Sequence, residues 1–474
     1  MDKKSIQHFA GLLVEFFFKI LEITLENITD LDLLTSKLAE EAKIFAARMV
    51  EEVLGEMNQE LREDKEYRKE MGLILKEKNR KRKFLTELGE LQFERDYYFN
   101  KKTGAFESPL DHMVGLEKRT RIANAVSAKL VSLATEVSYA KSAEFAANGA
   151  VSRQTVRNCI RRAPILEKEP AFKGKKQRFI EIYADEDHAH MQKPHKGKGK
   201  KSKIVPLVTV TEGTVAVSRN RNATVNPMHF VDENMDGKSL WESVEGFIEQ
   251  AYDMDSVEKI RIHADGGMWI RKGLENYENV EFVLDGYHLQ KRLRDFGRRF
   301  RNSNVRQRLN KALFEDNRDA AYEIFNDLMA KAADVESKMR IQEMNTYICS
   351  NWDAAVNRVK GDAPGSCTEG QVSHILSDRF SRNPMGWSEE CLGKLSKLRV
   401  YAKNGGKIKA EHFKCSYERN ESYKEYAENY IKQHHKGLNY GWISDLSEEM
   451  IFNTASGTQQ AIKSLGRVRN SLVV

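Results

Sequence analysis

The chain has 474 residues, of which 40% are hydrophobic and 31% are charged. This composition excludes a disordered chain, and the length predicts several structural units, because one ordinary core does not extend over so many residues. Lysine and arginine number 77 against 70 acids, a formal net charge of +7. That excess is too small to decide by itself whether the protein binds nucleic acid.

The most apolar stretch lies near the N-terminus, where "FAGLLVEFFFKILEITL" contains Glu15, Lys19 and Glu22. It is too short and too charged to span a bilayer, and no signal-peptide cleavage site accompanies it. The five cysteines are never in C-x-x-C spacing, which is typical of free thiols in a reducing compartment. We therefore expect a cytoplasmic protein without a membrane partner.

Residues 1–84 are predicted to form a helical arm. Apolar residues recur at steps of three and four through "LLTSKLAEEAKIFAARMVEEVLGEMNQEL", which is the spacing of one helix face. The role expected for this arm is packing or multimerisation. A second region, 85–165, begins with alternating residues in "LQFERDYYFNKKTGAFES", and this alternation predicts a β-hairpin.

The rest of region 85–165 contains a helix-turn-helix-like pattern. A first helix is expected to run to about Ala147, and Asn148-Gly149 to supply the turn before a second helix capped by Ser152. In a DNA reader this second helix enters the major groove. Its candidate contacts are Arg153, Gln154, Arg157 and Arg161. The alternative is a plain helical hairpin with a basic outer face.

Strands and helices alternate from residue 177 onward, and their order predicts a mixed α/β layer over 166–288. Within it, "IVPLVTVTEGTVAVS" is expected to form a strand pair. Residues 289–360 are predicted to be a helical insertion, after which 361–400 return to the core as a closing helix. A helical tail is expected over 401–474.

Carboxylates follow three hydrophobic strands of the α/β layer: Asp185 and Asp187 after the first, Asp265 after "IRIHA" and Asp285 after "EFVL". Adjacent carboxylates repel one another unless a cation neutralises them, and oxygen-rich sites of this kind suit Mg²⁺ or Mn²⁺. Two such ions support phosphodiester chemistry. Because side chains alternate along a strand, Asp185 and Asp187 share a face and remain equivalent at this point.

Two alternatives accompany the carboxylate interpretation. Acids at strand ends are often only solvated turn formers. The histidines around the acids, including His188, His190 and His263, also suggest zinc. However, no H-E-x-x-H motif is present, and no third ligand stands at a known spacing.

The motifs "ADEDHAHMQ", "HADGGMWI", "LDGYHLQKRL" and "CTEGQVSHILSDRFSRNPMGWSEECLGKLSKLR" occur in this order. Together they resemble the DDE transposases of bacterial insertion sequences, specifically the ISLre-type family related to the Mutator-like group, over about residues 85–400. The resemblance implies an RNase H-like core with a helical insertion. It also implies an enzyme that uses two divalent metal ions to cut the element's ends and join them to target DNA.

Matched motif by motif, the resemblance assigns catalysis and the two Mg²⁺ or Mn²⁺ ions to Asp185, Asp265 and Glu369. Asp285 and His288 match a further Mutator-like motif in "LDGYH", and they are predicted to support the site. Asp187 and His188 are expected to lie around the metal ligands in the same supporting role.

Further DNA contacts are predicted outside the helix-turn-helix-like region. A lysine-rich loop beside the site offers Lys198, Lys200 and Lys201, either as phosphate contacts or as a solvated loop. Residues after Glu369 are expected to grip or stack on a DNA end; they are Arg379, Arg382 and Trp387.

The expected partners are the double-stranded terminal repeats and target DNA, bound by a homo-oligomer in the nucleoid. Two other functions stay open. One is a transposase-derived DNA-binding protein without catalysis, and the other is an RNase H-like nuclease.

Overall fold

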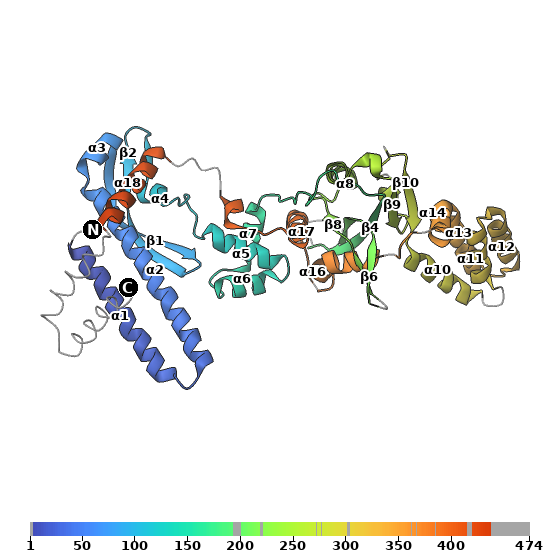
Figure 1. Cartoon of the computed structure of the whole chain (residues 1–474), viewed down its shortest axis with the longest axis horizontal. Helices are drawn as coiled ribbons and strands as arrows, with labels where there is room; N and C mark the ends of the chain where they lie inside the picture. Colours follow the sequence, from blue (N-terminus) through green and yellow to red (C-terminus); the bar gives the residue numbers. More distant parts are fainter. Residues whose placement is uncertain are drawn as a thin grey trace. The chain divides into compact units, whose positions relative to one another are not determined.

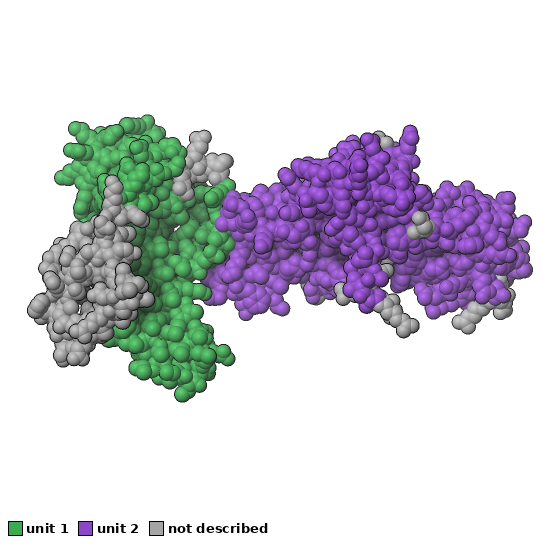
Figure 2. All heavy atoms as spheres, viewed as in Figure 1, with its two compact units in different colours: residues 1–126, 414–474 green, residues 127–413 purple. Residues whose placement is uncertain are grey.

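In a computed structural model of the chain, the described residues are 3–192, 201–218, 221–271, 273–275, 277–300, 304–361, 363–365, 367–383, 385–414 and 420–437. The chain forms two compact units (Figure 2). Unit 1 comprises residues 1–126 and 414–474, and unit 2 comprises residues 127–413. Lys198 and Lys200, predicted to contact phosphate, lie outside the described residues, as does the end of the predicted tail from 438.

Unit 1 begins with two long helices that pack against each other, with the rings of Phe16 and Phe45 stacked 4.3 Å apart. The helices of this segment are α1 (Lys3–Asn27), α2 (Leu31–Glu63) and α3 (Lys65–Met71). Asp30 caps α2 by accepting a hydrogen bond from the Leu33 amide.

The predicted helical arm ends earlier than expected, and its extension to residue 84 is wrong. Gly72 ends α3 at a φ of 72°, a left-handed conformation that glycine adopts without strain. The chain then forms strand β1 (Leu73–Thr86), which pairs with β2 (Gly89–Asn100). The basic run that seemed helical is therefore a strand, stabilised by a partner that follows it in the sequence.

The hairpin expected after residue 90 is confirmed as β2 and β3 (Ala105–Glu107), and β1 completes a three-stranded antiparallel sheet. Helix α4 (Pro109–Met113) and helix α18 (Glu421–Gly437) pack together in this unit. The Tyr423 hydroxyl donates to Glu107 Oε1 at 2.7 Å, which ties the end of the described chain to the sheet.

The predicted helix-turn-helix-like segment is helical as expected. It consists of α5 (Asn124–Ala134), α6 (Tyr139–Ala147) and α7 (Arg153–Arg162). Asn148 and Gly149 form the turn with φ values of 46° and 74°. The Ser152 hydroxyl caps α7 by accepting from the Thr155 amide at 3.2 Å.

Unit 2 contains a five-stranded mixed sheet in the order β10-β9-β4-β5-β8. Its strands are β4 (Phe179–His190), β5 (Ser202–Thr211), β8 (Met228–Phe230), β9 (Lys259–Ala264) and β10 (Val280–Leu284). The β10–β9 and β9–β4 pairs are parallel, while β4–β5 and β5–β8 are antiparallel. The α/β class with a mixed sheet is thus confirmed.

Helix α8 (Gly237–Ala251) buries Leu240, Val244 and Ile248 in the same core as Ile180, Ile182 and other strand residues. The short helix α9 (Met268–Arg271) follows β9, and a 3₁₀ turn spans Met254–Ser256. The predicted strand pair over "IVPLVTVTEGTVAVS" is wrong in its pairing. Strand β6 (Thr214–Ser218) pairs with β7 (Arg221–Thr224), while β5 pairs with β4 and β8.

A helical block follows β10 and has a hydrophobic core of its own, which includes Leu293, Leu309, Phe325 and Ile348. Its helices are α10 (Gly286–Arg299), α11 (Val305–Glu315), α12 (Arg318–Lys331), α13 (Val335–Ser350) and α14 (Trp352–Lys360). Figure 1 shows this block beside the β9–β10 edge of the sheet.

The chain then returns to the sheet through α15 (Thr368–Val372), which packs on β4. A π-helical turn at Ser373–Ser377, α16 (Asp378–Phe380) and α17 (Glu389–Lys403) continue this segment, which ends in a 3₁₀ turn at Ala410–Phe413. Among the described helices, none combines the length and the apolar character needed to cross a membrane.

Candidate functional site

Two of the predicted carboxylates belong to neighbouring parallel strands: Asp185 lies within β4, and Asp265 directly follows β9. The β4–β9 register pairs Tyr183 with His263, and their rings stack with centroids 4.7 Å apart. Side chains alternate along a strand, so Asp185 points to the same face of β4 as Tyr183. Asp265 stands two residues after His263, and its charge acts on the Asp185 carboxyl. The sheet therefore brings Asp185 and Asp265 together above the ring pair.

The charged form of the Asp185 carboxyl is disfavoured in this position. Burial, assisted by the nearby charge of Asp265, raises the pKa of its carboxyl to about 6. The Glu186 amide opposes this effect by donating to Asp185 Oδ1 at 2.8 Å. A partly desolvated carboxylate beside a second one is stabilised by a bound cation.

Asp187 has a different role from Asp185, although both lie on one face of β4. Its Oδ1 accepts hydrogen bonds from the hydroxyls of Ser377 and Ser381 at 3.1 and 2.9 Å. Only 7% of Asp187 is exposed. Asp187 thus holds the segment after α15 on β4. This role distinguishes Asp187 from Asp185, which strand alternation alone could not do.

Asp285 lies at the same end of the sheet, because its amide donates to the Ala264 carbonyl at 2.7 Å. Its carboxylate caps α10 by accepting from the His288 amide at 2.9 Å, and it is buried. Asp285 and His288, two of the residues predicted to support the site, therefore lie at the start of α10, the helix that leaves it.

Glu369, the third predicted ligand, lies exposed in the first turn of α15. The loop before it passes over the ring pair, where the Tyr183 hydroxyl is 3.5 Å from the Gly365 carbonyl oxygen. Among the described residues, no three His, Cys, Asp or Glu side chains lie close enough together to hold a metal ion. The structure thus brings Asp185 and Asp265 together, whereas Glu369 does not complete a preformed triad with them.

A buried charge network beneath the carboxylates was not identified from the sequence. Glu181 accepts from Arg261 at 2.9 Å and contacts His263 Nε2 at 2.6 Å, and all three residues are buried. Residues two positions apart on paired strands carry this network, so alternation would have placed them together had the β4–β9 pairing been known.

The histidine-rich alternative is not supported by the positions of the histidines. His188 and His190 are exposed. His263, in contrast, is fully buried against Glu181. Their side chains serve different environments rather than one zinc site.

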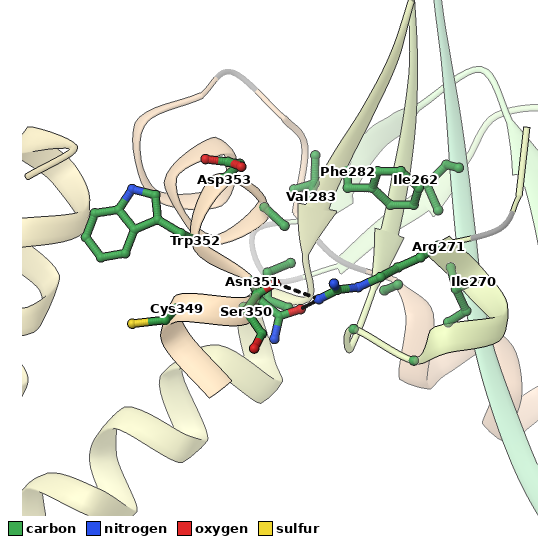
Figure 3. A pocket seen from close by; sticks show the side chains of 15 residues that line it. Ile262, Ile270, Arg271, Phe282, Val283, Cys349, Ser350, Asn351, Trp352 and Asp353 are labelled. Atoms are coloured by element: carbon green, nitrogen blue, oxygen red, sulfur yellow. Dashed lines mark hydrogen bonds between the residues drawn. The ribbon is translucent and has the colours of Figure 1, made fainter. Parts of the chain in front are cut away.

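The first glycine after Asp265 has a conformational and a steric reason. Gly266 has a φ of 101°, and a Cβ at this position would lie 2.6 Å from Asn351 Oδ1. Both residues line a cavity of about 220 Å³ between the sheet and the helical block, where Arg271 donates to the Ser350 carbonyl at 2.8 Å and to Asn351 (Figure 3). The Asp-Gly-Gly motif thus packs the strand end against the helical block.

The predicted DNA-reading helix α7 presents Arg153 and Gln154 to solvent, and Arg157 is half-buried. Arg161 is exposed and forms an ion pair with Glu390 at 2.9 Å. The surface that sequence analysis assigned to DNA is therefore accessible on α7, with one of its cations already paired.

The DNA contacts predicted for Arg379 and Trp387 are wrong, because both side chains are buried. Arg379 is 2% exposed, donates to the Ala134 carbonyl at 2.8 Å and lies 4.8 Å from the centre of the Trp387 ring. Burial lowers the pKa of Arg379 to about 10. Arg379 thus satisfies the Ala134 carbonyl at the end of α5 and is not available to DNA.

Arg399 has a similar role beside Arg379. It is 2% exposed, donates to the carbonyls of Thr135 and Ile375, and forms an ion pair with Glu136 at 2.9 Å. We call Arg379 and Arg399 the arginine clamp, because they bind the last carbonyls of α5 and the segment after α15. Arginine satisfies such carbonyls with several donors at once.

Two predicted cations remain on the surface. Lys201 is exposed. Arg382 is also exposed, and it contacts Asp378 and the Ser373 hydroxyl. Their accessibility is compatible with phosphate contact.

Comparison with known proteins finds the family described as "Uncharacterised protein family (UPF0236)", whose profile matches residues 24–415. A UPF0236 protein of Caldanaerobacter subterraneus subsp. tengcongensis is 33% identical over 408 residues, covering 85% of this chain and 84% of the relative. A second from the same organism is 32% identical over 392 residues, covering 82% and 81%, and its name joins eleven locus designations. A UPF0236 protein of Streptococcus gallolyticus is 22% identical over 335 residues, covering 67% and 71%.

Proposed function

The chain belongs to the UPF0236 family, and from the carboxylate pair of unit 2 we propose that it is a DDE transposase of the ISLre type. It binds the terminal repeats of an insertion sequence, cleaves the DNA ends and joins their 3′ hydroxyls to target DNA. The observation that carries the proposal is that Asp185 and Asp265 follow the paired residues Tyr183 and His263 on parallel strands, and that burial and the charge of Asp265 raise the pKa of Asp185 to about 6.

The order of the strands supports an RNase H-like core. Along the chain, β4, β5 and β8 come first and pair antiparallel as neighbours. Strands β9 and β10 come last, and β9 pairs in parallel with β4 and with β10. A mixed sheet with Asp185 on its first strand is compatible with the RNase H-like core that the resemblance implies. The helical block stands between Asp265 and Glu369 in the sequence, as the insertion of the resembled family does.

The relatives add an independent argument. One relative's name joins eleven loci of a single genome. Repeated copies of one gene within a genome are expected of a gene that a mobile element carries. This observation favours the transposase over an RNase H-like nuclease that serves the cell from one locus.

The carboxylates fit a hard divalent cation. Asp185 and Asp265 would hold Mg²⁺ or Mn²⁺, with Glu369 contributed from α15, because carboxylate oxygens are the ligands these ions prefer. When bound, two such ions would supply Lewis-acid activation of a water or 3′ hydroxyl and stabilisation of the departing oxygen.

The chain's own residues prepare the site for this chemistry. Glu181 and Arg261 hold His263 in the ring pair beneath the carboxylates. Asp187 holds the segment after α15 on β4. Helix α7 binds the terminal repeat, and a homo-oligomer on DNA brings two ends together.

A strand-cleavage assay tests the proposal. The substrate is a duplex carrying an end of the insertion sequence that encodes the chain, with Mg²⁺ present. The wild type should release the 3′ hydroxyl at the element end, whereas Asp185→Asn should cleave at least about 10³-fold more slowly, since removal of a metal-binding carboxylate removes transition-state stabilisation.

The matched control is Asp187→Asn, which removes a carboxylate from the same strand face. It should cleave within about tenfold of wild type, because Asp187 bonds to serines rather than to the reaction centre. Equal cleavage by wild type and Asp185→Asn would refute the site. DNA binding without any cleavage by the wild type would favour the non-catalytic alternative.

A further inference from the structure

Helix α10 has one strongly basic face. Its apolar side carries Leu289, Leu293 and Phe296, which are buried in the helical block. The opposite side is exposed and combines five cations with one acid, namely Lys291, Arg292, Arg294, Arg298 and Arg299 with Asp295. Amphipathic packing explains the apolar side but does not require so many cations on the other.

Few of these charges are neutralised nearby. Among the described residues, neither Arg292 nor Arg294 has a carboxylate within ion-pair distance. Arg298 lies 3.5 Å from Asp295, and Arg299 lies 2.9 Å from Glu336, both in exposed pairs. Exposed pairs of this kind hold their partners weakly and exchange them readily.

The basic face borders a cavity of about 550 Å³ between α10 and α13. Arg292, Arg298 and Arg299 line it from α10, and Arg340 lines it from α13. Tyr347 lies at its wall, with Arg292 4.2 Å from the ring centre and the hydroxyl buried without a hydrogen-bond partner among the described residues. The lining thus combines four arginines and an aromatic ring with two acids, Asp295 and Glu343, and Glu343 lies 3.7 Å from Arg340 in an exposed pair.

The basic face starts at the carboxylates. Asp285 both follows β10 and caps α10, and its amide bonds to Ala264, the residue before Asp265. Tyr347 is also within electrostatic reach of the site: burial raises the pKa of its hydroxyl to about 12, and the charges of Asp265 and Asp285 contribute. A strand held at the carboxylates can therefore continue along α10.

We propose that the exposed face of α10, together with Arg340, binds the phosphodiester backbone of the DNA segment adjoining the bond that is cut. This inference rests on the proposed function and assigns a surface for it that lies outside α7 and the lysine-rich loop. Backbone contacts of this kind fix the position of the duplex without reading its sequence.

The length of α10 sets the length of DNA it can follow. Fourteen residues at about 1.5 Å per residue extend about 21 Å, which corresponds to roughly six base pairs of duplex at 3.4 Å each. Shortening the duplex by about six base pairs on the side that α10 follows should therefore remove these contacts.

The test measures equilibrium binding of an element-end duplex to the full chain carrying Asp265→Asn, so that the DNA stays intact. In this background, the triple variant Arg292→Gln, Arg294→Gln, Arg298→Gln is compared with Lys311→Gln, Arg318→Gln, Lys331→Gln. The control residues belong to the same helical block and are paired with acids at 3.7, 3.0 and 2.6 Å. Both triple variants lose three positive charges, and equal thermal midpoints would establish that both fold.

The α10 variant should bind at least tenfold more weakly at 0.15 M salt, and the slope of log affinity against log salt should decrease by about 2 to 3, because each lost phosphate contact removes about 0.9. The control should keep both values. Trimming about six base pairs from one side of the cut site should weaken the Asp265→Asn parent but leave the α10 variant unchanged.

Equal affinity and equal slope for the two triple variants would overturn the inference. It would also be overturned if trimming either side of the duplex weakened binding by the parent and by the α10 variant to the same extent. Wild-type cleavage alongside such a result would leave the proposed function standing. A wild type that binds the duplex but never cleaves it would defeat the proposed catalysis alone, and one that binds no DNA would defeat both.

Discussion

The carboxylate pair and the arginine clamp are both clusters of charge inside unit 2, and they differ in how many hydrogen bonds the protein gives them. Arg379 and Arg399 donate to backbone carbonyls and are almost fully buried. Asp185 receives one amide donor and stands beside a second carboxylate, which raises its pKa to about 6. A charge that the protein pairs with hydrogen bonds stabilises the fold. A carboxylate whose charged form is disfavoured indicates a site where a bound cation would stabilise that charge.

This comparison predicts the largest effect at the carboxylate pair. Asp265→Asn should lower the rate of strand cleavage at least about 10³-fold, because an amide is a poor ligand for a hard divalent ion. Its thermal midpoint should stay at or above that of the wild type, because the change relieves repulsion with Asp185. Single-turnover cleavage and thermal unfolding measure the two quantities, and a loss of activity that only follows unfolding would break the comparison.

Arg399→Gln should have the opposite profile. We expect the free energy of unfolding of unit 2 to fall by about 3 to 5 kcal/mol, because several buried carbonyls and Glu136 lose their donor together. Urea denaturation followed by tryptophan fluorescence measures the change. A loss under about 1 kcal/mol would show that the clamp does not hold the two segments together.

The comparison can also be tested without an activity assay, because the contribution of Asp185 to the free energy of unfolding depends on pH. Its pKa in the fold is about 6 against an ordinary 3.8, so the folded state binds this proton more tightly than the unfolded state. The stabilising contribution is complete below about pH 4 and is lost as the pH rises through 6.

Without metal, Asp185→Asn should therefore be more stable than wild type by about 1 to 3 kcal/mol at pH 7, and the difference should vanish near pH 4. Denaturation at a series of pH values checks this expectation. Adding Mg²⁺ at pH 7 should raise the thermal midpoint of the wild type more than that of the variant. A difference that grows toward acidic pH would contradict the direction assigned here.

Asp187→Asn tests whether two acids on one strand face differ as their hydrogen bonds indicate. It should cost about 1 to 2 kcal/mol of stability, because the bonds from Ser377 and Ser381 lose their charged acceptor. The sign is opposite to that for Asp185→Asn. Identical stability changes in the two variants would remove the distinction.

The smallest effect is expected at Arg382, an exposed cation in the same segment as the clamp. Arg382→Gln should change the free energy of unfolding by no more than about 0.5 kcal/mol. If Arg382 contacts a phosphate, the slope of log affinity for DNA against log salt should decrease by about 1 in this variant. An unchanged slope would withdraw this residue from the DNA surface.

Local signals in the sequence were sufficient for several features. The turn and cap around Asn148 and Ser152 were predicted because their side chains and backbone conformations act within a few residues. The strand ends before Asp265 and Asp285 were also recognisable, since hydrophobic runs stop there. The strand end predicted before Asp185 is wrong, because pairing with β5 continues β4 to His190. These features depend on neighbours in the chain.

Other features depended on partners far away in the sequence. Residues 73–84 are a strand because β2 pairs with them. Arg379 is buried because α5 ends against it, more than two hundred residues earlier in the chain. No local pattern distinguishes such an arginine from one that faces DNA.

The sequence by itself determined the α/β order of unit 2, the strand ends before Asp265 and Asp285 and the helices around Asn148, because propensity, alternation and capping act locally. Only the tertiary structure decided that Asp185 meets Asp265 while Asp187 bonds to serines, and that the clamp arginines are buried. The physical reason is that strand pairing and the burial of charge depend on contacts between segments, and these contacts set which carboxylate stays available for a ligand.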